Sequence, residues 1–101
     1  MAIPKSVIAL MWEYDPAAIA ALRDIPDAVI ERVMERGRWD EMRWLLDAAG
    51  RERLSMFLQR RGGRTLPPRE LRFWCWVTRV SEPQATAWVQ QARQREALWR
   101  G

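Results

Sequence analysis

Histidine is absent from this chain of 101 residues, which has one cysteine, Cys75, and one lysine, Lys5. Histidine is the commonest general base, and zinc sites draw on clustered cysteine and histidine, so neither hydrolytic nucleophile chemistry nor a zinc cluster is expected. The lone cysteine leaves no intrachain disulfide, and its place in an apolar run predicts a buried, inert thiol. The carboxylates of Glu31 and Glu35 alternate with arginines, as on a solvated helix face. The sequence therefore predicts a protein that is not an enzyme and holds no cofactor or metal.

Phosphate-binding glycine loops and long hydrophobic runs are also missing. The stretch Ile3–Trp12 is too short and too interrupted to span a bilayer and no signal peptide precedes it, so we expect a cytoplasmic protein without a membrane contact. Apolar residues make up 49% of the chain and charged residues 30%, a globular composition. We expect one helical domain over residues 1–101, divided into an N-terminal segment (1–14), a helical core (15–80) and a C-terminal helix (81–101).

Prolines, glycines and cap residues divide the chain into short helices, and Ser6–Met11 is the one candidate strand. Asp15 followed by Pro16 predicts a capped helix start, with Trp12 and Tyr14 fastening the N-terminal segment across the helices. The fold class is expected to be all-α, a compact array of about five short antiparallel helices with an extended N-terminal segment. The inward-facing residues are expected to include Val29, Ile30, Val33, Met34, Leu45, Leu54, Phe57, Leu58, Leu71 and Trp74. The last helix carries a thin apolar stripe that docks on the core or on a partner: Trp88, Val89, Ala92 and Trp99.

Seven tryptophans are present, and the densest aromatic run is Leu71–Trp76. A helix through this run directs apolar side chains to nearly every side. Leu71 and Trp74 are expected in the core. Phe73 and Trp76 are covered by the N-terminal segment or the last helix, or they form an interface patch, because aromatic and arginine residues dominate interface centres. Together with Trp88 of the last helix, they are our candidate anchors for a partner.

Arginine supplies every positive charge except that of Lys5, and the net charge is +4. Five arginines gather around the segment Arg61–Thr65, a predicted flexible basic loop, and the helix start that follows it: Arg60, Arg61, Arg64, Arg69 and Arg72. Such a cluster at a helix start is a natural phosphate site, whereas a solvated loop paired with nearby acids is the alternative. Arg64, Arg69 and Arg72 are our candidates for partner or phosphate binding.

Several segments of the chain carry a family resemblance: Trp12–Pro16, Ile30–Gly37, Trp44–Leu46, Gly50 and Leu66–Trp74. In this order they resemble a small bacterial family of uncharacterised function, over roughly residues 12–80. Genes of that family often lie beside a nucleotidyltransferase of the abortive-infection toxin type, which implies the antitoxin of a toxin–antitoxin pair. One departure is Pro67, because the family usually has serine there as a helix cap. Thr65 is expected to cap one turn earlier.

Residues and resemblance together predict an antitoxin-like protein that binds and neutralises a nucleotidyltransferase toxin by occluding it. The aromatic anchors would fill the centre of the contact, and the arginines would complement an active-site mouth made negative by the need to hold magnesium. The alternative is a nucleic-acid-binding regulator that uses the basic region Arg60–Arg72. A third possibility is a homo-oligomeric adaptor that uses its last helix as the contact.

Overall fold

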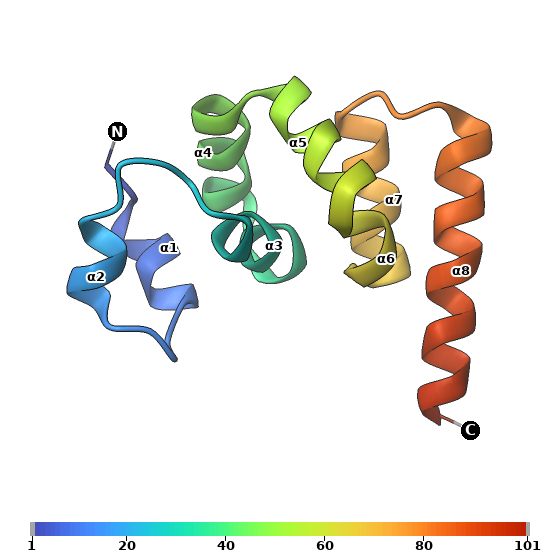
Figure 1. Ribbon diagram of the computed structural model, residues 1–101, viewed down its shortest axis with the longest axis horizontal. Coiled ribbons are helices and arrows are strands. Elements are labelled where there is room, and N and C mark those ends of the chain that lie inside the picture. Colours follow the sequence, from blue (N-terminus) through green and yellow to red (C-terminus); the bar gives the residue numbers. More distant parts are fainter. Residues whose placement is uncertain (1, 101) are drawn as a thin grey trace. The chain divides into compact units, whose positions relative to one another are not determined.

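The computed structural model describes residues 2–100, apart from the side chain of Arg100, and every regular element in that range is helical (Figure 1). This confirms the all-α class. The contacts within the chain divide it into two compact units, which we call the N-terminal unit (Met1–Gly50) and the C-terminal unit (Arg51–Gly101). The expected single domain remains a prediction, and each unit is described by itself. Gly50 has a φ of 84°, a conformation that residues with a Cβ rarely adopt.

Four helices make up the N-terminal unit: α1 (Lys5–Leu10), α2 (Pro16–Ala20), α3 (Asp27–Arg36) and α4 (Trp39–Ala49). The predicted cap of α2 is confirmed, since Asp15 Oδ1 accepts a hydrogen bond from the Ala17 N–H at 3.1 Å. The candidate strand over Ser6–Met11 is wrong, because α1 begins at Lys5 and shortens the expected extended segment. Val7 and Met11 are both buried, and their spacing of four residues suits a helix face.

The core of the N-terminal unit is built around α3, whose predicted apolar stripe is confirmed. Its four members are all buried: Val29, Ile30, Val33 and Met34. This stripe packs between α1 and α4, which contributes Leu45. At the start of α4, the carboxylate of Glu41 accepts the Arg38 N–H at 3.0 Å. Trp12 is 75% exposed and Tyr14 is also exposed, so the expectation that they fasten the N-terminal segment is wrong.

The C-terminal unit opens with a helical run that has no break: α5 (Arg51–Phe57), a π-helical turn η1 (Leu58–Gly62) and α6 (Gly63–Thr65). The predicted flexible loop over Arg61–Thr65 is therefore wrong. Gly62 and Gly63 are buried, and a Cβ on Gly63 would lie 2.9 Å from two ring atoms of Trp88. The glycines provide room for close packing. Thr65 does not cap the next helix either, because its hydroxyl donates to the Arg61 carbonyl at 3.4 Å.

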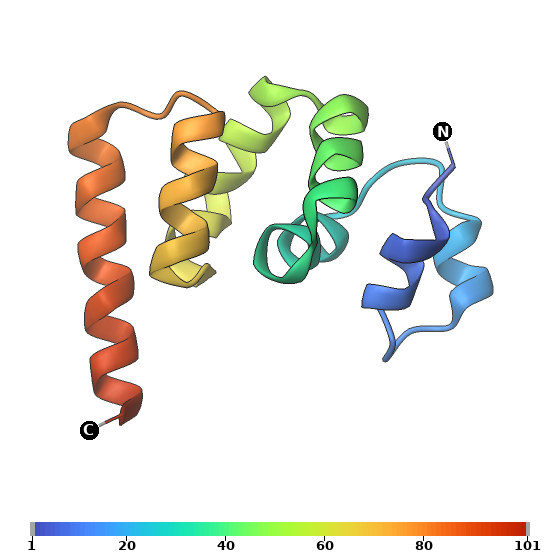
Figure 2. The ribbon, with the colours of Figure 1, turned by 180° about the vertical axis from the view of Figure 1, so that it is seen from behind.

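Two longer helices complete the C-terminal unit, α7 (Pro68–Val77) and α8 (Glu82–Arg100). They run antiparallel and side by side in both views (Figures 1 and 2). Their connection passes through Arg79, whose φ of 61° is left-handed, and the Val80 N–H donates to the Cys75 carbonyl at 3.0 Å. On α8, the buried residues are Ala85, Val89 and Ala92. Trp99 is 91% exposed, so of the two places expected for the stripe it does not take the one on the core of this unit.

Candidate functional site

Helix α7 carries two opposite faces with different chemistry. Its buried face consists of Leu71, Trp74 and Cys75, and the buried Thr78 continues this face just past the end of the helix. The opposite face, which we call the α7 face, consists of Arg69, Arg72, Phe73 and Trp76. Both sets follow the spacing i, i+3, i+4, i+7 that places side chains along one side of a helix. Four of the six predicted site residues therefore share one surface, and it is the surface turned away from the core of the C-terminal unit.

The two aromatic rings of the α7 face are connected to the core by ring contacts. Trp76 is 77% exposed, whereas Phe73 is half-buried and Trp74 is buried, as predicted. The Phe73 ring lies edge-on to the Trp74 ring, with centroids 5.4 Å apart, and its centroid is 6.4 Å from that of Trp76. Phe73 thus bridges the core aromatic and the exposed one. The exposure of Trp76 excludes its burial within this unit, and the role of Phe73 and Trp76 in an interface remains a prediction.

The three predicted charge residues differ in their partners. Arg72 Nη1 lies 3.3 Å from Glu82 Oε2, in a pair whose side chains are both open to solvent. Arg64 donates from Nη2 to the Arg60 carbonyl at 2.6 Å. Arg69 is exposed and makes no ion pair within residues 2–100. Because exposed ion pairs contribute little free energy, Arg72 can exchange Glu82 for a partner's carboxylate at small cost.

An open groove of about 570 Å³ adjoins the α7 face, between the start of α7 and the middle of α8. Its lining residues are Pro67, Pro68, Arg69, Glu70, Arg72, Val89, Arg93 and Glu96. The groove brings Arg69 and Arg72 together with Arg93, which the sequence did not single out. Arg93 lies 21 positions beyond Arg72 on another helix, and only the antiparallel pairing of α7 and α8 unites them.

Trp88 occupies a different setting from Phe73 and Trp76. It is half-buried on α8, and its ring lies where a side chain at Gly63 would otherwise go. The ring therefore takes part in packing α6 against α8. Its role as an anchor for a partner remains a prediction, and neither Trp88 nor Arg64 lines the groove.

Cys75 lies on the buried face of α7, and its expected burial is confirmed. Burial raises the pKa of the thiol from 9.0 to about 11, because a thiolate loses its hydration there. The thiol is therefore protonated at neutral pH. Cysteine reacts as the thiolate, so this environment opposes the use of Cys75 as a nucleophile.

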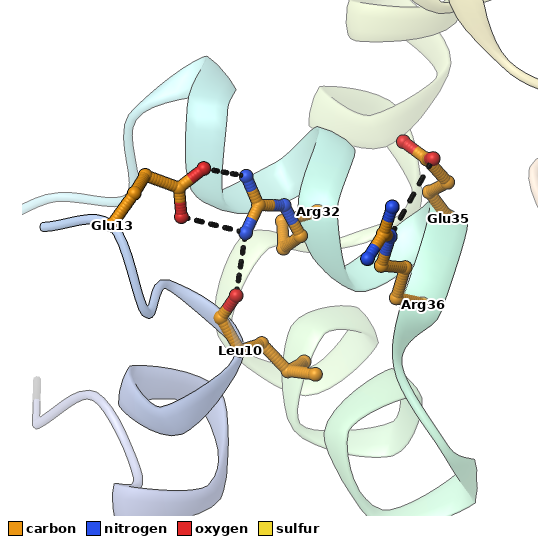
Figure 3. A network of polar contacts seen from close by, with 5 residues as sticks. All are labelled: Leu10, Glu13, Arg32, Glu35 and Arg36. Atoms are coloured by element: carbon orange, nitrogen blue, oxygen red, sulfur yellow. Dashed lines mark hydrogen bonds and ion pairs between the residues drawn. The ribbon is translucent and has the colours of Figure 1, made fainter.

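The N-terminal unit holds a polar network that the sequence did not reveal (Figure 3). Arg32 of α3 reaches Glu13 with two nitrogens, and its Nη1 also donates to the Leu10 carbonyl at 2.6 Å. This bidentate contact with Arg32 is the main reason why the pKa of Glu13 falls from 4.5 to about 2. The alternation of Glu31 and Glu35 with Arg32 and Arg36 predicts a solvated face, and Arg36 Nε does lie 3.7 Å from Oε1 of its neighbour Glu35. No local pattern signals a pair 19 positions apart.

Two further properties concern the whole described chain. Among residues 2–100, no three side chains of the metal-binding acids, cysteine or histidine lie close enough together to hold an ion. Within the same range, no helix combines the length and the apolar character that crossing a membrane requires.

A sequence comparison bears on the N-terminal unit above all. Residues 9–57 match the model of a family of unknown function (DUF6922). This range includes Glu13 and Arg32, so their bidentate contact lies inside the matched region. The resemblance predicted for Leu66–Trp74 lies outside it. No curated protein and no solved structure matches the chain. Over residues 9–57, the chain is similar to a small family of unknown function.

Proposed function

We propose that this chain is a non-enzymatic, antitoxin-like protein that binds a nucleotidyltransferase toxin and neutralises it by occluding its active site. The observation that supports this function is the α7 face, where two aromatic and two arginine side chains share one side of a helix. Interface energy concentrates in a few aromatic and arginine residues at the centre of a contact. The class of partner comes from the resemblance to a bacterial family whose genes often lie beside a nucleotidyltransferase toxin.

The geometry of the α7 face suits a docking surface in two respects. The edge-on contact with Trp74 orders Phe73 before any partner arrives, so less side-chain entropy is lost on binding. Arg72 lies about one turn from Trp76 along the helix, and Arg69 lies about two turns from it. A magnesium-binding active site must be acidic, so arginines beside an aromatic anchor complement its rim.

Co-purification tests this function. The untagged chain is expressed with the tagged nucleotidyltransferase of the neighbouring gene, and the eluate is separated by size exclusion in high salt. We expect a complex that survives the salt. Trp76→Ala should weaken it by about 2 kcal/mol or more, and Phe73→Ala should do the same. Trp39→Ala is the matched control, because Trp39 is 61% exposed but lies on α4 of the N-terminal unit.

Circular dichroism of each variant separates lost binding from lost folding. If Trp76→Ala and Phe73→Ala leave both the fold and the complex unchanged, the α7 face is not the docking surface. If no complex forms with the wild-type chain, the antitoxin function itself fails.

A nucleic-acid-binding regulator is the second candidate, supported by the exposure of the arginine cluster. Its five members are all exposed: Arg60, Arg61, Arg64, Arg69 and Arg72. Binding of labelled duplex DNA should then weaken steeply as salt rises, because counterions are released from the phosphates. A complex anchored by Trp76 should respond much less to salt. A flat salt response, or no binding of DNA at low salt, would exclude the regulator.

A further inference from the structure

Helix α8 has an exposed side that carries no charge. Its buried residues Ala85, Val89 and Ala92 face the rest of the C-terminal unit, which lies on one side of α8 in both views (Figures 1 and 2). On the opposite side, the residues from Pro83 to Leu98 are all glutamine, alanine, threonine, proline or leucine, and all of them are exposed. Charged residues make up 30% of the whole chain, and a solvated helix face normally carries many of them.

Four exposed residues form a narrow stripe along the middle of this side: Ala87, Gln91, Gln94 and Leu98. Their spacing of i, i+4, i+7, i+11 keeps them within about 60° of the helix circumference. The stripe ends in Leu98, which is 82% exposed, and the neighbouring Trp99 is exposed as well. Large apolar side chains that lie together on the surface mark interaction sites. The stripe therefore combines exposed apolar groups with neutral amides.

We propose that this stripe binds the same stripe of a second copy of the chain, with the two α8 helices antiparallel. The order of its residues is the reason. A two-fold axis between Gln91 and Gln94 places Leu98 of each copy against Ala87 of the other, so each large side chain meets a small one. The same axis places Gln91 against Gln94, and an amide side chain both donates and accepts hydrogen bonds. The stripe is thus complementary to itself, as a two-fold interface requires.

Charge favours the antiparallel arrangement over the parallel one. The first half of α8 carries Glu82 alone. The second half carries Glu96 and two arginines, Arg93 and Arg95. Antiparallel helices place each half beside the opposite half of the other copy, and their helix dipoles oppose each other. A parallel pair would instead place the arginines of both copies side by side and would set Leu98 against Leu98.

A helix pair of this length makes a small interface. The stripe spans about 17 Å along α8, at a rise of about 1.5 Å per residue. Stable interfaces bury roughly 1,200–2,000 Å² in total, so we expect a reversible dimer with a dissociation constant on the order of 10 µM or weaker. No charge has to leave water when the stripes meet, which keeps the cost of this association low. Salt should therefore not weaken the dimer.

Sedimentation velocity of the full chain alone tests the dimer. Between about 1 and 200 µM, we expect monomer to convert to dimer in low and in high salt alike. Gln94→Glu should weaken the dimer about tenfold or more, because it places a carboxylate from each copy at the centre of the interface. Gln59→Glu is the matched control, because Gln59 is exposed on η1 and gains the same charge. Circular dichroism should show the same helix content in both variants.

Disulfide cross-linking tests the direction of the helices. A chain with Ala87→Cys is mixed with a longer, tagged chain with Leu98→Cys, and the mixture is oxidised. Two cysteines join only when their Cα atoms lie within about 7 Å, so the antiparallel pair predicts disulfides between the two kinds of chain. A parallel pair predicts disulfides within each kind. The native Cys75 is buried and does not compete.

A chain that stays monomeric up to about 200 µM would overturn the proposal. A dimer that Gln94→Glu and Gln59→Glu leave equally strong does not form through α8, which would also overturn it. Cross-links found only within one kind of chain would overturn the antiparallel order. None of these results bears on the antitoxin function, because the stripe shares no residue with the α7 face and the test contains no toxin.

Discussion

The two units of this protein hold their helices together by different means. In the N-terminal unit, Arg32 of α3 spans to Glu13 and to the Leu10 carbonyl, so a charged group fastens a helix to the chain before it. In the C-terminal unit, Gly62 and Gly63 allow aromatic and aliphatic side chains to approach the backbone closely. The contacts in the N-terminal unit depend on the charge and hydrogen-bond geometry of Arg32 and Glu13. The contacts in the C-terminal unit depend on how closely the side chains fit against the backbone.

This difference predicts different sensitivities. A bidentate ion pair weakens when its carboxylate is protonated, whereas a tightly packed helix contact responds to volume. Substitutions that change volume should therefore act mainly on the C-terminal unit, and acid should act mainly on the N-terminal unit. Amide hydrogen exchange, resolved by residue, can follow the two units separately.

The largest effect is expected from Trp74→Ala, which empties the centre of the C-terminal unit. Trp74 is 1% exposed, and truncation of a buried aromatic costs about 3–5 kcal/mol of the free energy of unfolding. Urea unfolding measures the loss, and Trp39→Ala, on an exposed tryptophan, should lose far less. Hydrogen exchange should accelerate in α7 and α8 more than in α3. Equal acceleration in all three helices would show that the units do not unfold separately.

A smaller loss is expected from Gly63→Ala. Helix propensity alone would predict a gain of up to about 1 kcal/mol from this change. The new methyl group would lie 2.9 Å from the Trp88 ring, however, and overpacking of this kind costs about 1–3 kcal/mol. In a Trp88→Ala background the ring is gone and the 3.1 Å approach to the Leu58 carbonyl oxygen remains, so the same substitution should cost less than in the wild type. An equal effect in both backgrounds would show that the ring does not set the spacing.

A gain is expected from Arg79→Gly at the end of α7. Arg79 has a φ of 61°, which glycine adopts without steric strain, so the variant should be more stable by about 0.5–1 kcal/mol. Thermal and urea unfolding measure the change. Arg43→Gly makes the same substitution inside α4 and should instead lose about 1 kcal/mol. If Arg79→Gly and Arg43→Gly changed the free energy of unfolding in the same direction, the left-handed conformation of Arg79 would not explain the gain.

The smallest effect, and the one that sharpens the contrast, concerns Glu13→Gln. The pKa of Glu13 is about 2 in the folded protein, against 4.5 for the free carboxyl, so its contribution to stability is complete above pH 4.5. The contribution of Glu13 to stability is lost as the pH falls from 4.5 toward about 2. The wild type should exceed Glu13→Gln in stability at pH 7 but not near pH 2. Asp47→Asn removes one exposed carboxylate of α4 in the same unit and is the matched control.

Periodic features of single helices could be predicted from the sequence. The buried stripe of α3 and the two faces of α7 follow from helical spacing alone, and Asp15 caps α2 as expected. Four of the six candidate site residues share the α7 face for the same reason. A helix fixes the relative directions of its own side chains, whatever packs against it.

Features that depend on a second element could not be predicted. Gly62 and Gly63 resemble a flexible loop until Phe57 and Trp88 are placed against them. Arg32 resembles a solvated charge until the segment before α2 brings Glu13 within reach. Arg93 joins the groove only through the antiparallel course of α8. In each case a distant part of the chain decides the role of the residue.

The burial of Cys75 makes its thiol a probe of the local opening of α7. The thiol is 1% exposed and has a pKa of about 11, so a thiol reagent reacts with it only after α7 opens. At a reagent concentration where closing outpaces modification, the labelling rate measures the population of that open state. One labelling curve on the unmodified chain would thus give the free energy of local opening beneath the α7 face.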